Sequence, residues 1–181
     1  MTDFHPHFLA QDPWLQTVLG RYWPHSRPKV SEGNLLKVSL RDGDRVLLHE
    51  NIPREEASDS KLRVKRRWIV LVHGMAGCAT SSYMMRLASL FLHQGHPVVR
   101  VNLRNAGGGF GLSRNLYHAG RSDDLRDIFL YLSQRHPEAE FTAIGISLGG
   151  NILLKLAGEE GGCFQGMDSV AAVSPPIDLL A

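Results

Sequence analysis

Between residues 68 and 173 the sequence alternates short, continuous apolar runs with longer segments whose apolar residues recur at helical spacing. The predicted strands are residues 68–72, 97–103, 141–146 and 169–173, and the predicted helices are residues 82–94, a segment that starts at Ser122 as its N-cap, and residues 148–158. Continuous apolar runs are typical of strands that are buried on both faces. The alternation therefore predicts an α/β fold, with a mostly parallel sheet and helices on both of its faces.

The first 60 residues follow a different pattern. Residues 1–31 combine four prolines with several aromatic residues, which predicts an ordered lead-in that packs on the core. Two β-type runs, residues 35–40 and 45–49, flank Arg-Asp-Gly-Asp at 41–44, and Asp-Gly in that setting predicts a hairpin. Residues 51–60 are polar and contain Pro53, so we expect a loop. We thus divide one domain into the lead-in and hairpin (1–60) and the α/β core (61–181).

Composition excludes several classes of protein. The chain has 181 residues with 20 Lys plus Arg and 18 Asp plus Glu, so its net charge of +2 indicates no nucleic-acid partner. The basic run at 61–67 is interpreted as a solvated segment. Cys78 and Cys163 have neither disulfide nor zinc spacing, and no apolar run reaches 18 residues. We expect a cytoplasmic protein with no metal, no cofactor and no stable membrane span.

The sequence Gly-Ile-Ser-Leu-Gly-Gly at residues 145–150 lies directly between a predicted strand and a predicted helix. It fits the G-x-S-x-G pattern, in which a tight strand-to-helix turn presents a serine nucleophile. The glycines on either side let strand and helix approach without a clashing Cβ. Ser147 is therefore the candidate nucleophile, and the alternative is a small serine that merely fits a tight turn.

A second segment, His-Gly-Met-Ala-Gly at residues 73–77, follows the first strand of the core. Acyl transfer needs donors for the oxyanion, one from the residue after the nucleophile and one from the loop after an earlier strand. These donors would be the backbone N–H groups of Leu148 and Met75. We interpret His73 as a residue that braces the loop rather than a base, and Cys78 as a small packed side chain rather than a reactive thiol.

Four segments together resemble the YheT-like group of α/β-hydrolases: residues 73–77, Leu-Arg-Asn-Ala-Gly-Gly at 103–108, Leu-Tyr-His-Ala-Gly at 116–120 with Asp-Asp-Leu at 123–125, and residues 145–151. Residues 14–17 are similar to the lead-in of that group, although Trp14 stands where His is common. The resemblance implies a serine hydrolase of the carboxylesterase or acylglycerol-lipase type. Ser147 would be its nucleophile, Met75 and Leu148 its oxyanion donors, and a small-molecule ester or lipid its substrate.

The histidines depart from this family's pattern. In α/β-hydrolases the acid and the histidine of the triad follow the serine, whereas all nine histidines of this chain precede Ser147. Asp178 follows the last predicted strand and is interpreted as structural, and His118 as a residue that fixes its loop. The last residues, 179–181, are apolar. We therefore expect the N-terminal portion of a longer hydrolase, truncated after the strand that follows the nucleophile helix, without the triad Asp and His, and inactive or weak alone.

The sequence argues against two classes of nucleotide-binding protein and leaves one further alternative open. A dinucleotide-binding domain needs G-x-G-x-x-G after its first strand and an acid near the end of its second, and this sequence has neither. A P-loop is excluded because the glycines at 107–111 are not followed by the Lys-Ser or Lys-Thr pair that a P-loop requires. The alternative that stays open is a non-catalytic hydrolase-fold module that binds a ligand or a partner.

Overall fold

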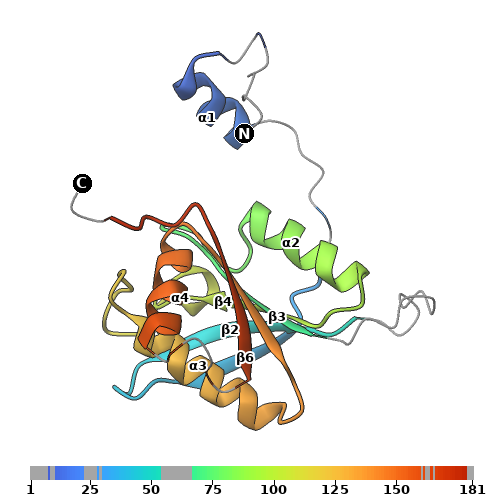
Figure 1. The fold of residues 1–181 in the computed structure, drawn as a ribbon, viewed down its shortest axis with the longest axis vertical. Coiled ribbons are helices and arrows are strands. Elements are labelled where there is room, and N and C mark those ends of the chain that lie inside the picture. Colours follow the sequence, from blue (N-terminus) through green and yellow to red (C-terminus); the bar gives the residue numbers. More distant parts are fainter. Residues whose placement is uncertain are drawn as a thin grey trace.

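The computed structural model describes residues 8, 11–22, 28, 30–53, 67–159, 161, 164 and 166–178. These residues form a six-stranded sheet in the order β1-β2-β4-β3-β5-β6, flanked by helices (Figure 1). The strands are β1 (Asn34–Ser39), β2 (Arg45–Asn51), β3 (Trp68–Val72), β4 (Val98–Asn102), β5 (Phe141–Ile146) and β6 (Met167–Val173). The helices are α1 (Pro13–Tyr22), α2 (Ser82–His93), α3 (Ser122–Arg135) and α4 (Leu148–Glu159), with a short 3-10 turn at Gly107–Gly109.

The sheet is mostly parallel, as predicted. Strands β4, β3, β5 and β6 pair in parallel, while β1 and β2 form an antiparallel hairpin that joins the sheet through β2 and β4. Asp-Gly closes the hairpin: Leu40 donates to the carbonyl of Asp44 at 2.8 Å, and Gly43 has φ +84°. The predicted hairpin is thus confirmed, with β2 extended by two residues to Asn51.

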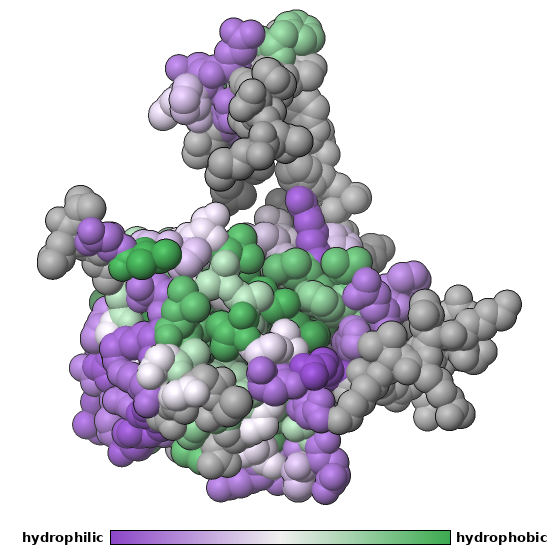
Figure 2. All heavy atoms as spheres, viewed as in Figure 1, coloured by the Kyte–Doolittle hydropathy of each residue, from purple (hydrophilic) through white to green (hydrophobic). Residues whose placement is uncertain are grey.

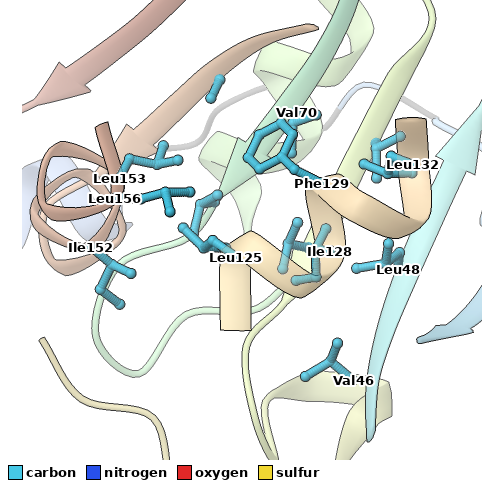
Figure 3. Packing of buried hydrophobic residues seen from close by; sticks show 14 of the residues in the cluster. Val46, Leu48, Val70, Leu125, Ile128, Phe129, Leu132, Ile152, Leu153 and Leu156 are labelled. Carbon is cyan, nitrogen blue, oxygen red and sulfur yellow. The ribbon is translucent and has the colours of Figure 1, made fainter. Parts of the chain in front are cut away.

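Helices cover both faces of the sheet, which confirms the second part of the prediction. Apolar side chains of α3 and α4 pack against one face in the larger cluster of the core (Figure 3). Helix α2 covers part of the other face, where Met84 and Ala88 contact Ile69, Leu71 and Val98. Strand β5 alternates buried and half-buried residues, because only its face toward α3 and α4 is fully covered.

Helix α3 begins one residue earlier than the sequence predicted. Ser122 is its first helical residue rather than its N-cap, and Arg121 at the N-cap position makes no capping hydrogen bond from its side chain. The hydroxyl of Ser122 instead donates to Glu159 at 2.7 Å and accepts from Lys155 at 2.9 Å. The side chain therefore ties α3 to α4, which sequence spacing alone does not reveal.

A buried arginine joins the hairpin to α3. Arg104 donates to both carboxylate oxygens of Asp124 at 2.6 Å and to Asp44 at 2.5 Å, and its nitrogen lies 2.8 Å from Asp42. Hydrogen bonds to Asp124 raise the pKa of Arg104 above its ordinary value. The same Asp44 accepts the backbone N–H of Arg114 at 3.0 Å, so this network also fixes the long loop after β4.

The N-terminal segment differs from the expectation that it packs on the core. Figure 1 shows α1 apart from the sheet, and the side chains of Phe8 and Trp14 are 72% and 73% exposed. Closer to β1, Val30 packs against the α2 side of the sheet. The residues 54–66, Cys163 and the apolar residues 179–181 lie outside the described residues. Among the helices that are described, none is long and apolar enough to cross a membrane.

Glu50 is buried near the end of β2, beside the start of β4. It accepts hydrogen bonds from Arg135 at 2.9 and 3.1 Å and from Asn34 at 3.2 Å, and the Nε2 atom of His136 lies 2.8 Å from it. Burial raises the pKa of this carboxyl, but the hydrogen bonds from Arg135, His136 and Asn34 outweigh burial and lower the pKa to about 2.

We predict that Glu50→Gln lowers the free energy of unfolding at pH 7 by about 1–3 kcal/mol, because a charged acceptor is lost. A folded pKa below the ordinary 4.5 gives stability that is present above pH 4.5 and lost as the pH falls toward 2. The variant should therefore lose less stability over that range. Urea unfolding at several pH values measures this, with the exposed Glu138→Gln as control; equal pH dependence of Glu50→Gln and wild type would contradict it.

Strand β6 has no neighbour on its second side among the described residues, and Ala171 and Val173 are exposed on it. Figure 2 shows apolar surface gathered on this side of the molecule around β6 and α2. An open strand with apolar side chains is a template for pairing with another chain.

We predict that the 181-residue chain self-associates through β6. Ala171→Lys should shift sedimentation velocity profiles toward monomer, since a lysine on an edge strand opposes pairing. Leu90→Lys on α2 is the control, because it removes an exposed apolar side chain without touching the edge. A monodisperse wild-type monomer with a cooperative melt would show that this edge does not pair.

Candidate active site

Ser147 occupies the turn between β5 and α4. Its φ is +52°, in the left-handed region that a residue with a side chain rarely adopts. The turn is held on both sides: the Ser147 N–H donates to the carbonyl of Val173 at 2.8 Å, and its carbonyl accepts from Asn151 at 3.1 Å. Ser147 is half-buried, and its hydroxyl has no hydrogen-bond partner among the described residues. Ser147 therefore lies in a strained turn, and its hydroxyl makes no hydrogen bond to another described residue.

The glycines around Ser147 are required by close backbone contacts. A Cβ on Gly145 would lie 2.5 Å from the carbonyl oxygen of Gly149, and a Cβ on Gly149 would lie 2.5 Å from the carbonyl oxygen of His73. Real Cβ atoms do not come this close to backbone atoms. Glycine at these positions thus lets α4 approach both β5 and the loop after β3, for the reason that the sequence suggested.

The loop after β3, residues 73–79, lies beside the turn of Ser147. A Cβ on Gly74 would be 3.1 Å from both the Cβ of Ser147 and the carbonyl oxygen of Ile146. This proximity follows from topology, because β3 and β5 are parallel neighbours and their carboxyl ends meet at one edge of the sheet. The two segments that the sequence singled out therefore stand next to one another.

The backbone amides of residues 74–79 differ in whether they have a hydrogen-bond acceptor. Five of them donate hydrogen bonds: Gly74 to Tyr83, Ala76 to Tyr117, Gly77 to Gly74, Cys78 to Ser81 and Ala79 to Asn102. The N–H of Met75 has no acceptor among the described residues. Leu148 is the first residue of α4, where backbone N–H groups lack helical partners. Among the described residues, the turn of Ser147 thus has one donor without a helical partner at the start of α4 and a neighbouring loop with one amide that lacks an acceptor.

His73 is fully buried and braces the loop, as predicted. Its Nε2 atom accepts the N–H of Leu103 at 3.1 Å, so its Nδ1 atom carries the proton and donates to the carbonyl of Gly74 at 2.7 Å. Burial lowers the pKa of His73 below its ordinary value. Both ring nitrogens are occupied and the ring is neutral, which makes His73 unsuited to take a proton from Ser147.

The other candidate side chains have local roles. His118 is exposed, and its Nδ1 accepts the N–H of Gly120 at 3.1 Å, which confirms that it fixes its own loop. Cys78 is half-buried rather than fully packed. Burial raises the pKa of its thiol, but hydrogen bonds with Thr80 and Ser81 outweigh burial and lower it. Asp178 lies exposed after β6. The described residues contain no cluster of His, Cys, Asp and Glu that could hold a metal.

Sequence reasoning missed the polar side chains that hold this loop. Arg100 in β4 is fully buried, and its Nη1 donates to the carbonyl of Ala79 at 3.0 Å. Asn102, two residues on, accepts the N–H of Ala79 at 2.8 Å. The available signal was a charge and an amide inside an otherwise apolar strand. The hydroxyls of Tyr83 and Tyr117, which accept amides of the same loop, carried no such signal.

A hollow of about 490 Å³ lies against the loop after β3. It is bounded by the loop itself, by the start of α2 and by Pro28. Its lining residues are Pro28, Met75, Ala76, Gly77, Thr80, Ser81, Ser82, Tyr83 and Met85. The hollow therefore offers space for a small molecule beside the loop that contains Met75, although Ser147 itself does not line it.

The sequence is similar to those of known proteins. The sequence profile described as the alpha/beta hydrolase fold matches residues 67–180. The chain is 28% identical over 148 residues to "Phospholipase ABHD3" of Bos taurus, which is 81% of this chain and 35% of that protein, and 30% identical over 146 residues to YheT of Escherichia coli (strain K12), 80% and 41%. The chain thus spans about a third of the length of the first and two fifths of the second.

The fold also matches solved structures. XC6422 from Xanthomonas campestris, described as an a/b serine hydrolase without lid, superposes with a TM-score of 0.66 at 18% identity. The match covers 84% of this chain and 66% of that one.

We predict that Gly149→Ala lowers the free energy of unfolding by about 3 kcal/mol or more, because the new Cβ would overlap the carbonyls of Val72 and His73. Gly158→Ala, on the same helix but with open space around it, is the matched control and should raise stability by about 0.5–1 kcal/mol. Chemical denaturation measures both. Similar stabilities for the two variants would show that the contact between α4 and the loop is not tight.

Proposed function

Because this chain belongs to the α/β hydrolase superfamily and is related to YheT, we propose that it supplies the nucleophile and the oxyanion donors of a serine hydrolase that cleaves carboxylic esters. The observation that carries the proposal is the unpaired N–H of Met75. It is the one amide of residues 74–79 without an acceptor among the described residues, and its loop lies against Ser147. A donor kept free beside a strained serine suits acyl transfer.

In the proposed reaction the Oγ atom of Ser147 attacks the carbonyl carbon of the ester. The carbonyl oxygen becomes an oxyanion, which accepts hydrogen bonds from the N–H groups of Met75 and Leu148 and faces the positive end of the α4 dipole. Collapse of this intermediate expels the alcohol, which takes up a proton, and leaves an acyl-serine. Water then attacks the acyl carbonyl, releases the carboxylic acid and regenerates Ser147.

Proton transfer needs a base and an acid, and the described residues place neither at Ser147. No histidine follows Ser147 in the sequence, and His73 already uses both of its ring nitrogens. The order Ser, then Asp or Glu, then His is general for this fold. We therefore propose that the 181 residues form the part of a hydrolase that carries the nucleophile, and that the triad Asp and His lie outside it.

The substrate that fits best is a small ester or an acylglycerol. The loops after β3, β4 and β6 each expose a large apolar side chain at the edge that carries Ser147, namely Met75, Leu116 and Ile177, which are 73%, 70% and 82% exposed. Such side chains suit contact with an acyl chain. The bovine relative is named a phospholipase, which supports the same class of substrate. A cytoplasmic location is proposed with this function.

The second candidate function is a module that binds a ligand without turning it over. The unpartnered hydroxyl of Ser147 favours it, because no described group activates the serine. The hollow beside Met75 would then hold the ligand. Covalent labelling of Ser147 separates the two candidates, since a binding module has no need of a reactive serine.

We predict that the 181-residue chain hydrolyses activated esters far more slowly than a version extended to supply an Asp and a His after Ser147. Without a base the hydroxyl of Ser147 stays a weak nucleophile at pH 7. The oxyanion donors and binding alone can leave about 10³–10⁴-fold catalysis over water. Release of p-nitrophenol from short-chain esters measures both rates.

Dependence on Ser147 is the decisive comparison. In the extended protein Ser147→Ala should abolish turnover and labelling by a fluorophosphonate, whereas Ser39→Ala on β1 should leave both intact. In the 181-residue chain Ser147→Ala should change the hydrolysis rate little. Strong labelling of the short chain that titrates near pH 6.5, and is lost in Ser147→Ala, would show that an upstream histidine supplies the base. An extended protein indifferent to Ser147→Ala would favour the binding module.

A further inference from the structure

We propose that Tyr83 and Tyr117 are positioning residues that fix the oxyanion donor. Their hydroxyls accept the two amides on either side of Met75, those of Gly74 and Ala76. This inference rests on the proposed function, because it concerns the use of the Met75 N–H by a reacting ester. It adds two residues that come from different elements and that make no contact with Ser147 among the described interactions.

Tyr83 holds the first side of the loop. It lies in the first turn of α2, and its hydroxyl accepts the N–H of Gly74 at 3.1 Å. A Cβ on Gly77 would lie 2.5 Å from that hydroxyl oxygen, so glycine at 77 leaves the room that Tyr83 needs. Glycine at 77 and tyrosine at 83 therefore act together to seat one hydroxyl in the loop.

Tyr117 holds the second side. It belongs to the long loop after β4, and its hydroxyl accepts the N–H of Ala76 at 2.8 Å. Ala76 has φ +54°, an unfavourable conformation that this hydrogen bond helps to maintain. The ring of Tyr117 stands edge-on to His73 with centroids 5.8 Å apart and packs against the larger core cluster. The packing of the ring thus also fixes the position of the Tyr117 hydroxyl.

The two hydrogen bonds further restrict the peptide group that carries the Met75 N–H, whose own carbonyl accepts from His73 and Gly77. This group is the peptide between Gly74 and Met75, and the peptide groups before and after it are each anchored by a tyrosine hydroxyl. With both neighbours anchored, rotation of the middle peptide is opposed. A donor that is oriented before the substrate arrives needs no reorganisation during the reaction. A displacement of about 1 Å in such a group can cost about 100-fold in rate.

The test uses Tyr83→Phe, Tyr117→Phe and the double variant of the chain extended to supply an Asp and a His after Ser147, which keep the rings and remove the hydroxyls. Tyr131→Phe on α3 is the matched control. Amide hydrogen exchange of Gly74 and Ala76 reports whether the loop is held. The rate of adduct formation at Ser147 with a fluorophosphonate, followed by mass spectrometry of the peptide over long incubation, reports whether the held loop aids reaction at Ser147.

We expect faster exchange at Gly74 in Tyr83→Phe and at Ala76 in Tyr117→Phe, with adduct formation slowed about 10- to 100-fold in each. In the wild-type adduct the amide proton of Met75 should shift downfield as it binds the phosphoryl oxygen, and this shift should shrink in both variants. Tyr131→Phe should match the wild type in every readout. These readouts distinguish a positioning role from a general loss of stability, because a general loss would not change the chemical shift of the Met75 amide proton selectively.

Faster exchange with unchanged adduct rates would overturn the inference and leave the proposed function standing, as would an equal loss of rate in Tyr131→Phe. A separate variant tests the proposed function: replacement of Met75 by its α-hydroxy acid removes the N–H and leaves the chain shape intact. If that replacement does not slow adduct formation, Met75 is no oxyanion donor, and the positioning role of the tyrosines falls with it.

Discussion

The contact between α4 and the loop after β3 is the constraint on which the rest of the site depends. Gly149 comes so close to the carbonyls of Val72 and His73 that no side chain can stand between them. This contact brings the start of α4, which follows Ser147, against a loop from a neighbouring strand. Because both belong to rigid elements of a parallel sheet, the serine and the amides around it are located by packing rather than by flexible connections.

Hydrogen bonds to buried polar groups then fix the orientation of the amides in the loop after β3. Nearly every amide of the loop has an acceptor, which is a tyrosine hydroxyl, the hydroxyl of Ser81, the amide oxygen of Asn102 or a backbone carbonyl. Arg100, buried without a carboxylate partner among the described contacts, holds carbonyl oxygens on either side of β4. Burying these polar groups is unfavourable unless they are paired, and all but Nδ2 of Asn102 among the buried polar side-chain atoms of these residues have a partner, so the loop has few alternative arrangements of similar energy.

Much of the fold followed from local pattern, and the reasons for the misses are physical. Strands β3 and β4 were evident because both of their faces are buried, and the turn at Ser147 was evident because three glycines mark a close approach. Ser122 was misassigned as an N-cap because its hydroxyl bonds to α4, a contact between helices that spacing along one segment cannot show. The detached position of α1 was missed because aromatic content reports apolarity and not what covers it. Tyr83 and Tyr117 were missed because a tyrosine that packs and a tyrosine that accepts an amide look alike in sequence.

The tautomer of His73 makes the structure around the loop after β3 sensitive to acid. The ring can accept the N–H of Leu103 only while Nε2 is unprotonated. Once acid is strong enough to protonate the buried ring, that acceptor becomes a donor facing a donor, and the junction of two strand-end loops must rearrange. Burial places this event below the ordinary pKa of histidine. Acid would then disturb the loop beside Ser147 through the protonation of His73, a structural residue, and not through the titration of Ser147 itself.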